Sequence, residues 1–530
     1  MQKNLILAVV LSSLVYIGWY SYMEKTLPQK APAAAASAAP QKPAEQSAAP
    51  TGLAAPAQSL MRAARAETAE AAKTGAKLTP AVSKALVSLT TDKAEYTFLA
   101  PGASLAGMVY QGPVAPVELV PNAGAGFFAT TFQSEFALRS KTADSVQFAA
   151  SLPGGLQLLK IFTLSPDNGL NSITVTAVNT SGKTQVLPAW EMFLGPGLGT
   201  VKSEEKENAS LWKAEYTYQE AGLKHPTIKE LKDDPAKEDP VWAGLNNRYF
   251  LAALVGGDLQ KTRPYRTQEK VGEDKAPVLA VPFAACELRP GEKREWTMSF
   301  YFGPKDYQHL QKLGNGLDRS VDFGYSLIAP LAKLANSALG YFYKLTGNYG
   351  VAIIIISVLL QLMLTPLSFK SYKAMAVMKK IQPEMQSIQK RYKDDPKRMN
   401  QEVMDLYKRH GTNPLGGCLP MLLQIPVFFA LFNALRNSWT LHGAPFAFWI
   451  KDLSAKDPFY VLPLVMGGIM FLQQYMTPQT SDPAQATMMK WMPVIFTFMF
   501  LSFPSGLVIY WLINSIWGFA QSMYLQKKMG

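Results

Sequence analysis

The second half of the chain contains long apolar stretches without a charged side chain. Leu345–Phe369 and Gly411–Leu435 each have 25 uncharged residues, Pro458–Ser481 has 24 and Trp491–Gln526 has 36. A helix needs about 20 apolar residues to cross the hydrocarbon core of a bilayer. As one helix the last stretch would be about 54 Å long, and Phe503-Pro-Ser-Gly506 interrupts it, so we expect two spans there.

Another apolar stretch, Leu5–Tyr22, lies at the N-terminus. It could be a cleaved signal peptide or a retained membrane anchor. We favour the anchor because aromatic residues end the stretch, which is typical of a membrane interface, whereas a cleavage site would have small residues there. The sequence therefore predicts six spans: one within residues 1–23, one at 346–369 and four within 413–530.

Basic residues predict the orientation of these spans. Residues 370–412, between the second and third spans, contain eleven Lys and Arg against five Asp and Glu. Short loops rich in Lys and Arg face the cytoplasm. Counting spans from this loop places both chain ends in the cytoplasm and residues 24–320 outside it.

The same basic segment is expected to form an antiparallel helical hairpin. Apolar residues recur at helical spacing on both sides of Asp394-Asp-Pro396, and Pro396 suits the start of a helix. Pro383 lies inside the first periodic stretch, where we expect a kink. The net charge of +6 would attract anionic lipid, and it would equally suit a ribosome or an arriving polypeptide.

The region outside the cytoplasm changes character near residue 82. Residues 24–81 are rich in Ala and Pro, which predicts a flexible or partly extended tether. In residues 82–320, β-forming stretches such as Ser172–Val178 alternate with turns, the pattern of a large antiparallel β-sandwich. The apolar periodicity of residues 321–345 predicts an amphipathic helix on the outer membrane surface or packed beneath the β-domain.

Composition then excludes several classes of function. The chain is 48% hydrophobic and only 17% charged, so a wholly soluble protein is excluded. Two cysteines, Cys286 and Cys418, exclude a disulfide scaffold and a Cys-based zinc site. We find no nucleophile motif, metal-ligand spacing or nucleotide-binding loop, and therefore expect no cofactor, no metal site and no enzymatic activity.

Uncharged polar residues within the spans are the candidate functional groups. Gln361 and Gln424 each lie a few residues from the expected cytoplasmic end of a span, where they could line a hydrophilic recess. Interhelical hydrogen bonding is the alternative explanation. Sixteen of the 22 methionines follow residue 360, which favours an adaptable apolar surface.

Three motifs in the second half resemble the YidC family of membrane protein insertases, in its long Gram-negative form. The resemblance covers the chain from about residue 322 onward, while the rest matches only the family's arrangement. It implies a multi-pass α-helical inner-membrane protein of six spans, with a five-helix core bundle and a large periplasmic β-sandwich. The motifs are Asn413-Pro-Leu-Gly-Gly-Cys-Leu-Pro420 with Gln424 and Pro426, Ala444–Ser454 with Asp457-Pro458, and Phe503–Val508 with Tyr510.

The resemblance also implies an insertase and folding chaperone for nascent membrane proteins. Such a protein would receive hydrophobic segments from the ribosome or the Sec translocon in a polar groove open to cytoplasm and lipid. It would release them sideways into lipid without nucleotide hydrolysis, and the β-sandwich would be largely dispensable for insertion. The candidate groove residues are Ser357, Gln361, Gln424 and Trp511.

One position departs from the family. Most members have an arginine where this chain has Gln361. Glutamine keeps the polar character of the position without the positive charge. A mechanism in which that charge attracts an acidic substrate tail therefore does not carry over.

Two other classes of protein would have different sequence features from an insertase. A secondary transporter should show inverted repeats or broken helices around ion ligands, and the sequence shows neither. A membrane-anchored periplasmic carbohydrate-active enzyme would need paired acidic groups at a sugar cleft. The sequence does not decide whether such a pair forms.

Overall fold

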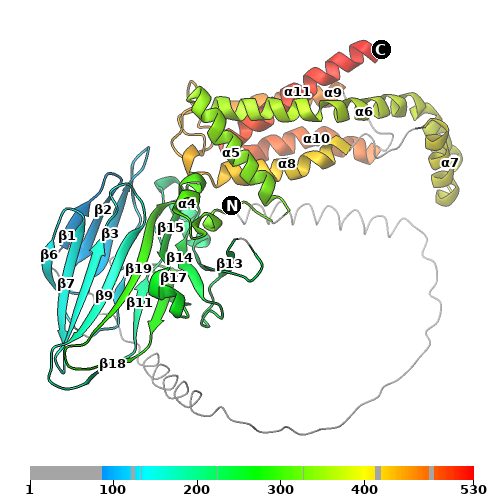
Figure 1. The fold of residues 1–530 in the computed structure, drawn as a ribbon. Helices are drawn as coiled ribbons and strands as arrows, with labels where there is room; N and C mark the ends of the chain where they lie inside the picture. The colour runs from blue at the N-terminus through cyan, green and yellow to red at the C-terminus, as the bar shows by residue number, and fades with distance from the viewer. Residues whose placement is uncertain are drawn as a thin grey trace, which may run out of the picture. The chain divides into compact units, whose positions relative to one another are not determined.

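The computed structural model describes residues 86–120, 126–132, 134–223, 225–325, 327–411, 419–476 and 483–529. The expected anchor, 1–23, and tether, 24–81, lie outside these ranges. A β-rich domain (the β-domain, Leu86 to Pro304) is followed by a helical part that runs to Met529 (Figure 1). This order of a β-rich domain and a helical part confirms the expectation from sequence.

The β-domain is built on a nine-stranded sheet in which all neighbouring strands are antiparallel. On β9, in the middle of the sheet, every second side chain is buried. This alternation is expected of a strand with one face against a core. The strands in spatial order are β13 (Thr227–Glu230), β12 (Lys213–Tyr218), β14 (Pro240–Asn246), β15 (Phe250–Val255), β19 (Lys293–Pro304), β9 (Asn171–Asn179), β8 (Leu156–Thr163), β7 (Ser145–Leu152) and β6 (Ala137–Lys141).

Smaller sheets pack against the large one through aromatic side chains. Phe98 of β2 lies 4.7 Å from Phe162 of β8, and Trp190 of β11 lies 5.4 Å from Trp296 of β19, between ring centroids. Facing sheets joined by such a core form a sandwich. The smaller sheets are β1 (Leu86–Thr90), β2 (Ala94–Leu99), β3 (Ser104–Gln111) and β4 (Pro116–Glu118); β16 (Tyr265–Val271), β17 (Asp274–Phe283), β11 (Trp190–Leu194) and β5 (Ala129–Thr130); and β10 (Gln185–Leu187) with β18 (Cys286–Leu288).

Helices cover part of the second face of the large sheet, at β14, β15 and β19. Leu251 and Tyr301, on β15 and β19, form an apolar cluster with Leu310 of α4 (Tyr307–Leu313) and with alanines of α5 (Ala329–Thr346) and α8 (Leu419–Arg436). Every residue of β15 is consequently buried. The β-domain therefore contacts the helical part through packed side chains.

The helical part contains one helix that the sequence had divided in two. The expected second span, 346–369, and the first hairpin helix are a single helix, α6 (Tyr349–Arg391), of 43 residues. At Lys370 this helix changes from apolar to charged and polar residues but does not end. Pro366 and Pro383 both lie inside it. The other helices are α5 (Ala329–Thr346), α7 (Pro396–Arg409), α8 (Leu419–Arg436), α9 (Val461–Met476), α10 (Pro483–Phe500) and α11 (Ser505–Met529).

The interfacial helix expected at residues 321–345 is α5, and it starts later than predicted. Residues 321–325 are not helical, and Pro330 occupies the first turn. Leu334 and Leu345 are each 65% exposed, whereas Leu339 is buried against the other helices. Helix α5 thus has one exposed apolar face and one packed face, so its two sequence-based interpretations are compatible.

Within the described ranges, Tyr349–Ser371 is the one helical segment whose length and hydropathy both suit a membrane crossing. Val461–Tyr475 and Lys490–Phe500 are shorter apolar helices. The long uncharged run at 491–526 is divided between α10 and α11, as its Pro-Ser-Gly break predicts. The total of six spans stays a prediction.

Candidate functional site

A recess of about 250 Å³ lies among α6, α8, α9 and α11. Five amide side chains line it together with one aromatic ring, and no lining residue is charged. We call it the amide recess. It is lined by Gln361, Leu364 and Ser368 of α6, Gln424 of α8, Met470 and Gln473 of α9, and Trp511, Asn514, Ser515, Gly518 and Gln521 of α11.

Hydrogen bonds between helices fix the amides of this recess. Gln361 Nε2 donates to Asn514 Oδ1 at 2.7 Å, and Gln424 Nε2 donates to the Tyr510 hydroxyl at 2.7 Å. Asn514 Nδ2 is itself buried. These two bonds therefore link α11 to α6 and to α8.

A second polar contact continues along α6 and α11. The Thr365 hydroxyl donates to the backbone carbonyl of Gln361 at 2.7 Å. It accepts from Gln521 Nε2 at 2.9 Å and from Trp517 Nε1 at 3.3 Å. Polar groups thus follow the α6–α11 contact over more than one turn.

Trp511 forms the apolar side of the recess. Its ring lies 5.1 Å from Phe428, 5.6 Å from Phe496 and 5.2 Å from Phe500, measured between centroids. These rings come from α8 and α10. They pack against Trp511, which is the one aromatic ring that lines the recess beside its five amides.

The structure brings together three of the four predicted groove residues. Gln361, Gln424 and Trp511 line the amide recess. Ser357 does not: it is fully buried, donates to the carbonyl of Ile353 at 2.7 Å, and borders a separate apolar gap of about 10 Å³. The sequence had not singled out Gln521, although it follows Asn514 by seven residues on α11, a spacing that places both on one helix face.

The opposite end of the helical part is closed by packed apolar side chains. Ile353 of α6, Leu435 of α8 and Val508 of α11 belong to one buried cluster with Leu453 of the α8–α9 loop. The backbone N–H of Gly506 donates to the carbonyl of Leu453 at 3.0 Å. Two of the motifs that resemble the insertase family therefore form this closed end.

The side chain of Asp457 forms hydrogen bonds at this closed end of the helical part. Its carboxylate is buried and accepts from the N–H of Leu462 at 2.7 Å, the N–H of Phe459 at 3.0 Å and Trp449 Nε1 at 3.0 Å. A carboxylate at the start of a helix satisfies donors that lack intrahelical partners. Asp457 thus fixes both the start of α9 and the loop before it.

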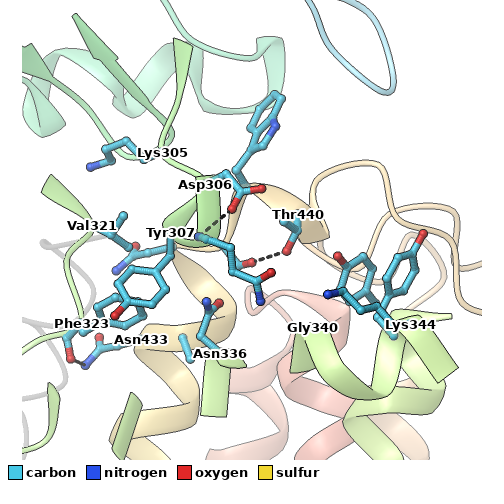
Figure 2. A pocket seen from close by; sticks show the side chains of 17 residues that line it. Lys305, Asp306, Tyr307, Val321, Phe323, Asn336, Gly340, Lys344, Asn433 and Thr440 are labelled. Atoms are coloured by element: carbon cyan, nitrogen blue, oxygen red, sulfur yellow. Dashed lines mark hydrogen bonds between the residues drawn. The ribbon is translucent and has the colours of Figure 1, made fainter. Parts of the chain in front are cut away.

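A second cavity, of about 220 Å³, lies where the β-domain meets α5 and α8 (Figure 2). Asn336 and Gly340 of α5 face Asn433 of α8 across it, and Lys305 lies at its β-domain side. Burial lowers the pKa of Lys305 to about 8, and its ammonium donates to the carbonyl of Ser320 at 3.1 Å. The sequence did not predict this cavity, because its walls come from distant segments.

The described part of the chain contains no group of three or more His, Cys, Asp or Glu side chains able to hold a metal ion. The amide recess holds hydrogen-bond donors and acceptors but no charged side chain. Such a site can solvate a polar group that has left water.

Known proteins are similar to this chain over most of its length. Models of the 60Kd inner membrane protein family and of the YidC periplasmic domain match residues 341–530 and 47–334. The membrane protein insertase YidC of Endomicrobium trichonymphae is 41% identical over 426 residues, which cover 78% of this chain and 79% of the relative. That of Geobacter metallireducens is 42% identical over 382 residues, covering 71% and 69%.

A solved structure of an active YidC insertase with its first transmembrane domain resolved matches 88% of this chain and 99% of its own, at 18% identity and a TM-score of 0.40. The two family models and the curated relatives define an inner-membrane protein with a periplasmic β-rich domain. The chain belongs to the YidC family of membrane protein insertases.

Proposed function

We propose that the amide recess receives the polar flank of a hydrophobic segment and that the chain then releases this segment sideways into the inner membrane. The observation that carries the proposal is a cluster of uncharged amides among otherwise apolar helices. A polar flank must cross about 30 Å of hydrocarbon, where each charge costs several kcal/mol. A recess part-way across shortens that path, and the apolar segment then partitions into lipid without nucleotide hydrolysis or enzymatic chemistry.

We further propose that the recess opens to the cytoplasm and to lipid and is closed toward the periplasm. Gln361 lies ten residues before Ser371, where the apolar part of α6 ends, a distance of about 15 Å. The buried cluster around Leu453 supports closure at the other end. The proposed topology has six spans, five of them in a core bundle, with both chain ends and the hairpin 370–412 in the cytoplasm.

The basic hairpin is the proposed receiving surface. Helices α6 and α7 pack there through Ile381, Met385 and Leu406. Eleven basic residues against five acidic ones suit an acidic partner such as the ribosome. We propose that substrates arrive from the ribosome or from the Sec translocon.

Protease protection of a small one- or two-span substrate tests this function. The substrate is added, without nucleotide, to proteoliposomes that contain only the purified protein. We expect more protected substrate than with empty liposomes. Equal protection in the two samples would contradict autonomous insertion.

A further inference from the structure

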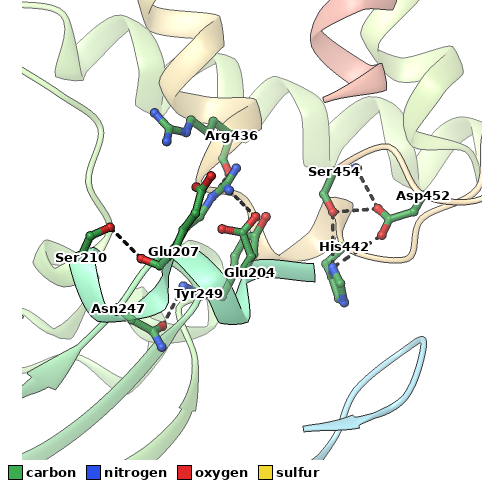
Figure 3. Close-up of polar contacts among 10 residues, drawn as sticks. Glu204, Glu207, Ser210, Asn247, Tyr249, Arg436, His442, Asp452 and Ser454 are labelled. Carbon is green, nitrogen blue, oxygen red and sulfur yellow. Dashed lines mark hydrogen bonds and ion pairs between the residues drawn. The ribbon is translucent and has the colours of Figure 1, made fainter. Parts of the chain in front are cut away.

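The β-domain contacts α8 at Arg436 (Figure 3). This end of α8 lies away from Gln424 and the amide recess. Arg248, between β14 and β15, donates from Nε at 3.1 Å and from Nη2 at 2.9 Å to the backbone carbonyl of Arg436, the last residue of α8. The last carbonyls of a helix lack intrahelical partners, and a cation is favourable there. Arg248 therefore caps α8 from another domain.

This cap is itself held in place. Arg248 Nη1 pairs with Glu204, and the two side chains are only 4% and 14% exposed. Both groups lie between the β-domain and the helical part, where solvent screens them little. The position of the Arg248 guanidinium is thus set by the β-domain.

Trp439 makes a second, independent contact. It follows α8 by three residues, yet its side chain is 7% exposed and belongs to the core of the β-domain. Its ring lies 4.9 Å from Phe250 and 6.0 Å from both Tyr110 and Tyr249. A loop of the helical part thereby completes an aromatic cluster of the β-domain.

A third contact reaches the last turns of α8. Asn437 Nδ2 donates to the carbonyl of Asp322 at 2.7 Å, and Asn433 Nδ2 donates to that of Phe323 at 3.4 Å. These carbonyls belong to the segment that joins the β-domain to α5. Side-chain caps, an inserted ring and amide contacts together fix this end of α8.

The other end of α8 contributes Gln424 to the amide recess. Gln424 precedes Arg436 by twelve residues, about 18 Å along the helix. Pro426 lies inside α8, two residues after Gln424, yet the helix runs unbroken from Leu419 to Arg436. The place of Gln424 therefore depends on where the capped end of α8 lies.

We propose that Arg248 is a positioning residue, through which the β-domain holds α8 at the depth where Gln424 lines the amide recess. Where it concerns insertion, this inference rests on the proposed function. It gives the β-domain a role in insertion, whereas the family resemblance implies a β-sandwich that is largely dispensable for insertion.

The test measures how readily a water-soluble reagent reaches position 424 in the recess. In a chain carrying Cys286→Ser and Cys418→Ser, Gln424→Cys reports the place of α8 through its rate of labelling by a small water-soluble maleimide in proteoliposomes. We expect Arg248→Ala to change this rate several-fold and, in the chain that keeps Gln424, to lower insertion several-fold. Arg248→Lys, which retains the positive charge but not the planar guanidinium, should restore part of both.

Arg266→Ala is the matched control. Arg266 also lies in the β-domain and pairs with Glu230 and Asp233, which lie on its surface. Arg266→Ala should change neither the labelling rate nor insertion. Protease resistance of the β-domain shows that each variant is folded, and Trp439→Phe tests the same contact if Arg248→Ala does not fold.

Unchanged labelling and insertion in a folded Arg248→Ala variant would overturn the proposal. So would reduced insertion with unchanged labelling, because Arg248 would then act elsewhere. If labelling changes while the wild-type chain inserts nothing beyond empty liposomes, the positioning role stands and the proposed function fails.

Discussion

At the residue scale, the core of the β-domain encloses a lysine. Lys160 on β8 is fully buried, and its ammonium donates to the backbone carbonyl of Phe128. The rings of Phe136 and Phe162 each lie 5.8 Å from it. Burial lowers the pKa of Lys160 from 10.5 to about 7. Protonation of this one side chain is therefore coupled to folding near neutral pH.

This coupling has a definite sign. From about pH 7 to about pH 10.5 the unfolded chain binds a proton at Lys160 that the folded chain does not, so the free energy of unfolding should rise with pH. The slope is at most about 1.4 kcal/mol per pH unit. Lys160→Met should remove this contribution. Urea unfolding of the solubilised full chain between pH 7 and pH 10, followed by circular dichroism, measures it, and equal pH slopes for both chains would refute the coupling.

The amide recess leads to a second residue-scale prediction. Gln361→Ala removes one donor but leaves Gln424, Gln473 and Asn514 in place. We expect a modest loss of insertion, and a much larger one when Gln361, Gln424 and Asn514 are all replaced by apolar residues. Gln401→Ala, at an exposed position of α7, is the control. Equal losses from the single and the triple change would show that Gln361 acts alone.

Part of this recess was predictable from the sequence. Gln361 and Gln424 stand out because an amide within an apolar span needs a polar neighbour. Ser357 lies one turn before Gln361 but faces an apolar gap. The spacing of apolar and polar residues shows which residues share a face of one helix. It does not show how that helix is rotated relative to the next. The partners Asn514 and Tyr510 therefore became clear only from the structure.

At the scale of single elements, a change from apolar to charged residues did not mark the end of a helix. Lys370 predicts where the chain leaves the membrane, yet α6 continues for 21 residues to Arg391. Proline inside a helix removes one hydrogen bond and often produces a kink, and both Pro366 and Pro383 are accommodated. Asp394-Asp-Pro396 does end the helix, and the Asp395 carboxylate caps α7 by accepting from the N–H of Arg398. Local turn chemistry was therefore the better guide to helix ends.

Helix α9 gives a prediction at this scale. Asp457→Ala removes a buried carboxylate that accepts from three donors. Each buried donor left without a partner costs about 1–3 kcal/mol, so we expect the Tm of the detergent-solubilised chain to fall by several degrees. Asp405→Ala, whose side chain is 50% exposed on α7, should have little effect. Similar Tm values for the two variants would contradict the capping role of Asp457.

At the scale of the whole molecule, the sequence predicted the order of the parts but none of the contacts between them. Apolar runs, basic loops and β-patterns are local, and each identifies its own segment. The cavity beside Lys305 and the burial of Trp439 depend on segments more than a hundred residues apart. No pattern within either segment indicates such a contact.

The proposed topology can be tested with two single cysteines. Met404, 49% exposed on α7, and Leu223, 52% exposed in the β-domain, are replaced in turn by cysteine in a chain without Cys286 and Cys418. A membrane-impermeant maleimide should label Leu223→Cys from the periplasmic side and Met404→Cys only after the membrane is opened. Labelling of both from one side would contradict the predicted orientation.

The burial of Trp439 also has a consequence for the order of events during synthesis. The last strand of the β-domain ends at Pro304, and Trp439 leaves the ribosome 135 residues later. At 5–20 residues per second this delay is on the order of ten seconds. Throughout that time Tyr110, Tyr249 and Phe250 lack the ring that fills the space between them. The β-domain therefore completes its core only after α8 has been made and its following loop has reached the periplasm.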